Sequence, residues 1–317
     1  MKGKALPSKH DRFDLNRIKP VPVSDVGHKV RVEQFGKTMK KGTSVEALLR
    51  GLPDLLAARD MNRAIDRIVA AKKSGAPVLF LFGAHVIKCG LAPVLIPLIR
   101  DGIVSGLATN GAGAIHDYEI ARFGTTSENV AENLPKGIFG MSGETAEGIN
   151  GALRDGLAEG LGFGESIGRA LAEGKAAHKD VSLFAAAYEA GIPFTVHVAL
   201  GTDIVHMHKS ASGEATGEAT MRDFLTFTAL VEKLTGESVV LHAGSAVVLP
   251  EVLLKAVSMC RNAGSPPGEF LAVNCDMNRM YRPTQNVLRR PSGEGIDLAG
   301  HHEILLPLLV AGIYGRL

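Results

Sequence analysis

The segment 77–118 contains two apolar runs, and a glycine-containing turn follows each of them. The first run, Pro77 to Phe82, has no polar residue, which is typical of a strand buried on both faces of a parallel sheet. Gly83 ends this run, and a helical pattern comes next. The second run, Ile103 to Thr109, leads into Asn110-Gly111-Ala112-Gly113. The segment therefore predicts a strand, a turn, a helix, a second strand and a second turn.

The two glycine-containing turns define the expected binding crevice. Because the carboxyl ends of parallel strands meet at one edge of a sheet, both turns should lie side by side there. Turn amides and a helix N-terminus at that edge favour anionic groups such as a pyrophosphate. The glycine spacing is not GxGxxG, so the motif by itself does not identify a dinucleotide site.

The rest of the chain continues the alternation of strands and helices. Further strands are expected at 193–200, 238–242 and 269–274, with helical patterns between them. Residues 127–140, 210–217 and 293–300 are expected to be irregular or flexible loops. This order predicts an α/β, Rossmann-like fold, with a mostly parallel sheet covered by helices on both faces. We expect one domain over residues 43–317.

Residues 1–42 differ from the rest because they are basic and contain several prolines. A solvated tail is one interpretation. We favour an arm that lies on a neighbouring subunit, because Val30, Val32 and Phe35 alternate as in an edge strand. This interpretation predicts a homo-oligomer.

Composition excludes several classes of function. The net charge is +2, which gives no general field for nucleic acid, and Trp is absent, which argues against a base-stacking surface. No apolar run reaches membrane-spanning length, and the first residues have no apolar core of a signal peptide. The three cysteines form no CxxC pair, which favours a reducing, cytoplasmic compartment.

The order of segments resembles the deoxyhypusine synthase family from about Val30 to the C-terminus. The segments that carry the resemblance are VRVEQFGKTMKKGTSVEALL, GAHVIKCGLAPVLIPLIRDGIV, LATNGAGAIHDYEIARFG, GFGESIGRALAEGKAAHKDVSLFAAAYEAGIPF, ALGTDIVHMHKS, LHAGSAVVLPEVLLKAVSMCRNAG and LLPLLVAGIYGRL. The resemblance implies a Rossmann-like fold and a tetramer that binds NAD at subunit interfaces. Members of the family oxidise spermidine and move its aminobutyl group to an enzyme lysine, then to a lysine of a translation factor.

The resemblance also implies site residues. The family's active-site histidine falls on His208. The implied NAD contacts fall on Ala84, His85, Val86, Ile87, Lys88, Asn110, Gly111, Ala112 and His116. At His116 the family has an acidic residue.

One departure from the family bears directly on the reaction. The family's lysine nucleophile should lie where this chain reads Val248-Leu249-Pro250-Glu251, and Lys255 comes about one helical turn too late. A covalent imine intermediate needs an amine. The family's neighbouring Trp is also absent. We therefore predict that the protein does not form deoxyhypusine, although its fold and cofactor are retained.

Histidines near position 206 suggest an alternative chemistry. His206 and His208 would share one face of an extended strand end, where Asp203 and His242 could complete a Zn²⁺ or Fe²⁺ site. The same histidines could serve as a general base and its electrostatic helper, or be polar residues at a strand end.

Other polar residues at the predicted crevice also have two interpretations. For His116 and Asp117 we favour acid–base chemistry or ribose contact over helix capping, whereas Glu119 is interpreted as a cap. Lys88 could neutralise a phosphate or act as an amine nucleophile. At the last helix, 301–303 is interpreted as capping and exposed rather than as a metal or substrate contact.

Three functional hypotheses follow from these patterns. The first is an NAD-binding enzyme that acts on a small amine or alcohol, with His208 as base. The second is a metal-dependent hydrolase or lyase that uses His206, His208, Asp203 and His242. The third is a non-catalytic nucleotide-binding protein that kept the fold and lost the lysine.

Overall fold

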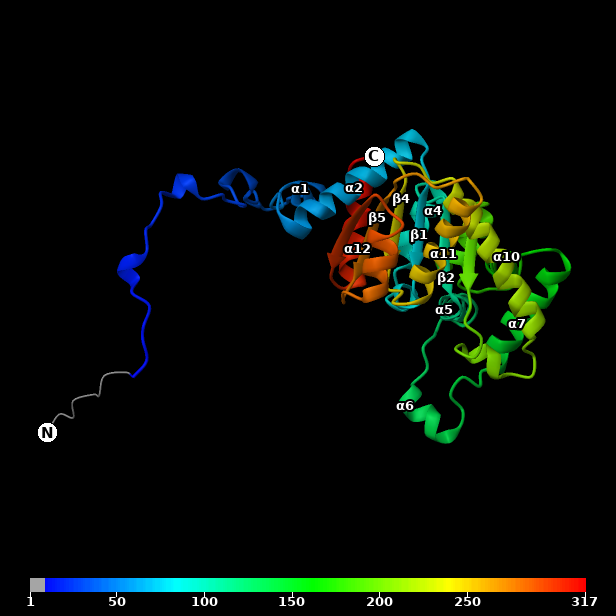
Figure 1. Ribbon diagram of the computed structural model, residues 1–317. Helices are drawn as coiled ribbons and strands as arrows, with labels where there is room; N and C mark the ends of the chain where they lie inside the picture. The colour runs from blue at the N-terminus through cyan, green and yellow to red at the C-terminus, as the bar shows by residue number, and fades with distance from the viewer. Residues whose placement is uncertain (1–8) are drawn as a thin grey trace.

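The computed structural model describes residues 9–317, which form a six-stranded sheet with helices on both of its faces (Figure 1). The strand order is β3-β2-β1-β4-β5-β6, and every neighbouring pair is parallel. The strands are β1 (Val78–Phe82), β2 (Gly106–Asn110), β3 (Phe194–His197), β4 (Val239–Ala243), β5 (Leu271–Asp276) and β6 (Glu294–Ala299). The predicted α/β, Rossmann-like fold is confirmed.

Twelve α-helices of the described chain connect and cover the strands. They are α1 (Val45–Arg50), α2 (Leu56–Ser74), α3 (His85–Lys88), α4 (Ala92–Arg100), α5 (Gly111–Phe123), α6 (Val130–Asn133), α7 (Gly143–Ala158), α8 (Phe163–Ala172), α9 (Leu183–Glu189), α10 (Gly213–Glu232), α11 (Val248–Asn262) and α12 (His302–Tyr314). The long helices expected near 55–73, 143–159, 250–262 and 301–314 are present, with bounds that shift by a few residues.

Two separate apolar clusters occupy the two faces of the sheet. Phe80 and Phe82 of β1 pack with side chains from α2, α4 and α12, and with those of α5 and α7–α9. Leu79 and Leu81 of the same strand pack with α10 and α11. Successive strand residues point to opposite faces, so an apolar run without polar interruption supplies both cores at once.

The β6 strand corrects the expectation of a loop at 293–300. In β6 only Ile296 and Leu298 are buried, and they alternate with Glu294, Gly295, Asp297 and Ala299, which are partly or fully exposed. A strand at the edge of the sheet has a neighbour on one side only, here β5. Such a strand can carry charged side chains, so its sequence lacks the apolar run that marks the central strands.

Two further local expectations were wrong. Of the loop expected at 210–217, residues 213–217 are helical, because α10 begins at Gly213 with the Ser212 side chain accepting a hydrogen bond from the Ala215 N–H. The extended strand end expected to carry His206 and His208 is instead a 3-10 helix, Ile204–Met207, which contains His206 and is followed by His208.

The carboxyl ends of β1 and β2 lie at the same edge of the sheet, as predicted, because Leu81 pairs with Ala108 in parallel register. The strand order reverses between β1 and β4, whose ends are packed tightly. A Cβ atom on Gly83 would lie 2.0 Å from the Gly244 carbonyl oxygen. No side chain fits between these two turns.

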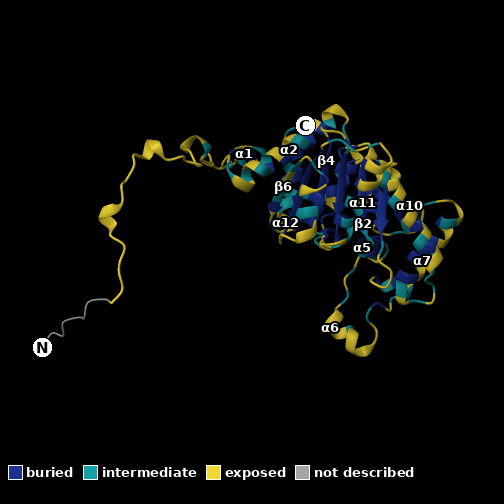
Figure 2. Cartoon of the chain, in the orientation of Figure 1, coloured by how far each residue is buried: buried dark blue, intermediate teal, exposed yellow. Residues whose placement is uncertain are grey.

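Residues 9–42 extend away from the body as an exposed arm (Figures 1 and 2). The predicted edge strand is absent from it, since Val32–Gln34 forms a 3-10 turn and Val30, Val32 and Phe35 are exposed. The arm joins the body where the Lys37 N–H donates to the Gly51 carbonyl and the Asp54 N–H donates to the Gln34 carbonyl. Residues 1–8 of the predicted arm lie outside the described chain.

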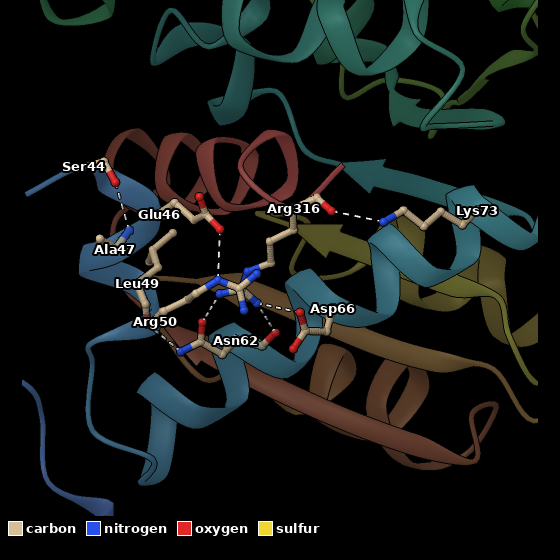
Figure 3. Close-up of polar contacts among 9 residues, drawn as sticks. All are labelled: Ser44, Glu46, Ala47, Leu49, Arg50, Asn62, Asp66, Lys73 and Arg316. Carbon is tan, nitrogen blue, oxygen red and sulfur yellow. Dashed lines mark hydrogen bonds and ion pairs between the residues drawn. The ribbon is translucent and has the colours of Figure 1, made fainter.

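Side-chain hydrogen bonds hold the C-terminal residues against α2 (Figure 3). The Arg316 side chain is 4% exposed, and its guanidinium donates to the Asn62 carbonyl (3.1 Å) and to Asp66 Oδ1 (2.8 Å). Lys73 Nζ donates to the Arg316 carbonyl at 3.2 Å. Within residues 9–317, no helix has the length and apolar character needed to cross a bilayer.

Candidate functional site

A cavity of about 210 Å³ lies at the carboxyl edge of the sheet, where α3, α5 and the 3-10 helix 204–207 meet. It adjoins a more open hollow of about 470 Å³, with which it shares Glu119, Ser127 and Glu128. The charged and titratable side chains that line the cavity are Lys88, His116, Glu119, Glu128 and Asp203. Three of the predicted NAD-contacting residues, Lys88, Ala112 and His116, therefore line one cavity.

The hydrogen bonds around His116 fix its tautomer. Thr126 Oγ1 donates to Glu119 Oε2 at 2.5 Å, which uses the single hydroxyl proton. The same oxygen lies 2.6 Å from His116 Nδ1 and must accept there, so the proton is on Nδ1. Nε2 then carries a lone pair. Burial, and then the charge of Lys88, lower the pKa of His116 to about 4, so the ring is neutral near pH 7 and can accept a hydrogen bond at Nε2.

The second predicted turn is the first turn of α5, and protein groups already occupy it. Asn110 Oδ1 caps the helix by accepting from the Gly113 N–H at 3.0 Å. The Asp203 carboxylate lies against Gly111, where a Cβ atom would come within 1.9 Å of Asp203 Oδ2. A phosphate at this helix N-terminus would have to displace Asp203, so the pyrophosphate expectation for Asn110–Gly113 is not supported by this packing.

His208 has a supporting position outside the cavity. Its Nε2 lies 2.8 Å from the Gly140 carbonyl and donates to it. The Gly140 N–H donates to Glu128 Oε1 at 2.8 Å. His208 and Glu128 thus bind the two backbone polar groups of Gly140, its carbonyl and its N–H. Gly140 ends the segment that supplies Glu128, Val130 and Phe139 to the cavity wall.

Asp117 is 1% exposed and faces α9. Its carboxylate accepts from the Ser182 hydroxyl and from the Leu183 N–H, at 2.8 Å for the latter. Burial raises its pKa to about 6, and these hydrogen bonds partly oppose the shift. Both oxygens serve the start of α9, and Asp117 lines none of the cavities described above.

The alternative metal set is not assembled. Asp203 and His206 form a capping box that starts the 3-10 helix, with His206 Nδ1 accepting from the Asp203 N–H at 3.3 Å. His242 is fully buried on β4, and its Nδ1 lies 2.7 Å from Asn274 Oδ1. Since β1 and β2 separate β4 from β3, His242 is remote from His206 and His208.

The place of the family's lysine is helical in this chain. α11 begins at Val248, and Leu249 and Pro250 are buried. Lys255 pairs with Glu251 on the surface, beside the groove between α10 and α11. Among residues 9–317, Lys88 is the amine that lines the candidate cavity.

Sequence reasoning missed part of this site. The sequence indicates a helix cap at Glu119 and predicts an irregular stretch over 127–140. Glu128 lies in this stretch, and Thr126 directly precedes it. The available signal was the polar run Thr125-Thr126-Ser127-Glu128 directly after Gly124, which ends α5. The loop is packed because Gly140, at φ 72°, lies against Met207 and Ile204.

The remaining predicted NAD contacts surround α3. Ala84 precedes the helix, while Val86 and Ile87 are buried in the core beneath it. His85 is exposed and lies toward the start of α12, its ring centroid 5.6 Å from that of His302. These positions are at the predicted edge of the sheet, but only Lys88 of the group lines the cavity.

No protein-family model matches the chain, and a search of curated proteins finds no match. Solved structures do match its fold. AgrE in complex with ornithine and NAD⁺ superposes with a TM-score of 0.55 at 16% identity, over 81% of this chain and 33% of that one. Apo ArgZ, a cyanobacterial arginine dihydrolase, gives a TM-score of 0.52 at 18% identity, over 83% of this chain and 34% of that one.

A protein assigned as a deoxyhypusine synthase from Entamoeba histolytica matches with a TM-score of 0.54 and 14% identity. There the match covers 88% of this chain and 96% of the other. By contrast, the chain spans about a third of the length of ArgZ and AgrE. The chain thus has the fold of deoxyhypusine synthase, as its order of segments predicted.

Proposed function

We propose that this protein binds NAD and acts on a small amine, in a reaction other than deoxyhypusine formation. The observation that carries the proposal is the cavity at the carboxyl edge of the sheet, lined by Lys88, by three carboxylates and by a neutral His116 whose Nε2 keeps a lone pair. AgrE, a third of which matches the fold of this chain, was solved in complex with NAD⁺ and ornithine, and this supports the cofactor and an amine-bearing substrate.

The charges in the cavity suggest how the cofactor would lie. Lys88 is the group suited to a diphosphate, whereas a carboxylate such as Asp203 repels phosphate and accepts hydrogen bonds from ribose hydroxyls. We therefore expect the diphosphate on the α3 side and a ribose near α5. This orientation agrees with the occupied N-terminus of α5 and does not require Asp203 to move.

The same charges favour an amine over an alcohol. Glu119, Glu128 and Asp203 outnumber Lys88, so the cavity attracts a cation. His116, with a pKa of about 4, is too weak a base to deprotonate an ammonium, so the amine would lose its proton to water and bind neutral, donating a hydrogen bond to His116 Nε2. The nitrogen lone pair would then assist loss of hydride from the adjacent carbon. NAD, when bound, supplies the hydride acceptor. No covalent amine intermediate is needed.

Calorimetry with NAD and a spectroscopic assay for NADH over a panel of small amines and alcohols test the proposal. His116→Asn should lower kcat/KM by about 10-fold, the factor that corresponds to the loss of one hydrogen bond that orients the amine. His178→Asn, at an exposed histidine outside the cavity, is the matched control. Absence of NAD binding would refute the proposal, and binding without turnover would favour the non-catalytic alternative.

The negative part of the proposal has its own test. Incubation with NAD, labelled spermidine and a translation-factor substrate should leave the factor unlabelled, because the start of α11 offers no amine. Label on the factor would show that another lysine serves as nucleophile. Lys88→Arg would then reveal whether that lysine is the one in the cavity.

We also propose that the protein is a homo-oligomer. The arm exposes the apolar side chains of Phe13, Leu15, Ile18, Val21 and Val23, which no other part of residues 9–317 covers. Contact with a neighbouring subunit would bury them. Light scattering on the purified protein measures the state directly, and a monomer at micromolar concentration would contradict this expectation.

A further inference from the structure

His85, Cys89 and Glu303 meet on the side of α3 that faces α12, apart from the cavity with Lys88. Cys89 Sγ lies 3.3 Å from His85 Nε2 and 3.7 Å from Glu303 Oε2. All three donor atoms lie within 4.8 Å of one another. Within residues 9–317 this is the group of histidine, cysteine and acidic side chains that converges closely enough to share one ion.

We propose that these three residues bind a Zn²⁺ ion. Zn²⁺ accepts thiolate, imidazole and carboxylate ligands in tetrahedral sites, with bonds of about 2.0–2.3 Å. Such bond lengths place the sulfur of a tetrahedral site about 3.5 Å from its nitrogen and oxygen ligands. The two measured separations bracket this value, so the side chains need no large movement to hold the ion. The mixed soft and hard donors fit Zn²⁺ better than Mg²⁺ or Ca²⁺.

The backbone explains how the three residues come together. Cys89 follows α3, and its N–H donates to the His85 carbonyl at 2.9 Å, so His85 and Cys89 stand one helical turn apart on one side. Glu303 lies in the first turn of α12. The start of α12 is held at this edge by His302, whose Nε2 donates to the Cys275 carbonyl at 3.1 Å.

A buried histidine next to the three ligands, His302, is a second and independent observation about this site. Its side chain is 1% exposed, and its Nδ1 has no hydrogen-bond partner. A ring nitrogen that donates to a backbone carbonyl while the other keeps its lone pair is the arrangement usual for a metal-binding histidine. The His302 ring lies beside the cluster, with its centroid 5.6 Å from that of His85, but it is not one of the three converging ligands. Three ligands with exposed flanks leave a fourth position for water or a substrate atom, as in catalytic zinc sites.

This site is separate from the cavity proposed to bind NAD. It uses none of the residues that line the cavity, and it lies beside the point where the strand order reverses between β1 and β4. Open α/β sheets bind ligands at such points. The Gly83–Gly244 contact closes the space directly over the two strands, which leaves the flank between α3 and α12.

The experiment titrates the full-length, reduced protein with Co²⁺ alone, and then with Zn²⁺ in competition with a chromophoric chelator. One equivalent of Co²⁺ should bind and give a thiolate-to-cobalt charge-transfer absorption. Cys89→Ser should abolish that absorption. His85→Ala and Glu303→Gln should keep it but weaken binding by more than about 100-fold, because loss of a supporting residue alone costs 10–100-fold.

Cys260→Ala, which removes a buried cysteine outside the cluster, is the matched control and should keep both the absorption and the affinity. Circular dichroism checks that each variant is folded, and Glu303→Gln changes an exposed side chain that the core does not need. Failure to bind one equivalent, or an absorption that persists in Cys89→Ser, would overturn the proposal. NAD affinity, measured in the same samples, tests the proposed function separately.

Discussion

Gly111→Ala tests whether the Asp203 carboxylate lies against the first turn of α5. An added Cβ would come within 1.9 Å of Asp203 Oδ2 and 2.7 Å of its Cγ, far inside contact distance. The Asp203 side chain is buried, so it cannot turn into solvent without leaving its cap on the 3-10 helix 204–207. We expect a loss of about 1–3 kcal/mol in the free energy of unfolding, the usual cost of overpacking.

A double-mutant cycle separates the clash from the intrinsic effect of alanine. Asp203→Ala alone should cost about 1 kcal/mol through the lost cap. In the double variant the clash is gone, so its cost should fall below the sum of the two single costs by about 1–3 kcal/mol. Urea denaturation followed by circular dichroism measures all four proteins at one pH.

Gly151→Ala is the matched control for this cycle. Gly151 lies inside α7, and the nearest atom to an added Cβ is 3.9 Å away, in the Arg154 side chain. This substitution should stabilise the protein by roughly 0.5–1 kcal/mol, since glycine is unfavourable within a helix. If Gly111→Ala is also stabilising, or if the cycle is additive, then Asp203 does not occupy the α5 terminus and the proposed cofactor orientation loses its basis.

Four further predictions follow from the same contacts. The pKa of His116 is lowered from 6.5 to about 4 in the folded protein, so the unfolded chain binds the extra proton first; its contribution to stability should be lost as pH falls from 6.5 to 4, and His116→Gln should show a smaller loss over that window. Lys88→Met should raise the pKa of His116 toward its ordinary value, as read from histidine ring protons by NMR, and an unchanged pKa would place the ammonium elsewhere. Arg316→Met should cost about 1–3 kcal/mol in urea denaturation, because it removes charged hydrogen bonds to α2, and Arg50→Met, at an exposed ion pair, should cost less than about 1 kcal/mol. Deletion of residues 1–33 should lower the mass measured by light scattering if the arm joins subunits, and an unchanged oligomer would assign assembly to the body of the protein.

The sequence predicted the parts of the fold whose burial is uniform. β1, β4 and β5 are buried along their whole length, so their residues carry the apolar signal without interruption. Prediction from the sequence failed for segments whose structure depends on whether a partner strand lies on one side of them. β6 pairs with β5 alone, and the Val30–Phe35 alternation in the arm has no partner strand in the described chain. Local alternation cannot distinguish these two cases, because the difference lies in a remote strand.

The candidate site was predicted where it depends on the edge of the sheet and missed where it depends on side-chain direction. His116 follows β2 by a fixed number of residues, so the topology places it in the crevice. Its neighbour Asp117 points to a different side of α5 and accepts hydrogen bonds from the start of α9. Residues adjacent on a helix are about 100° apart, and only the packing of α5 selects which of the two enters the cavity.

The tight contact between Gly83 and Gly244 explains why the edge of the sheet offers two compartments. In an open sheet of this order, the space between β1 and β4 is the usual place for a ligand. Here a Cβ on Gly83 would overlap the Gly244 carbonyl, and the His302 ring covers Gly244 from above, with its Cε1 2.7 Å from the position of a Cβ there. Ligands are therefore displaced to the flanks of α3, toward Lys88 and His116 on one side and toward Cys89 and Glu303 on the other. The helix α3 is one turn long and contributes residues to both compartments. An ion bound by Cys89 and Glu303 would therefore restrict the helix that supplies Lys88 to the other compartment.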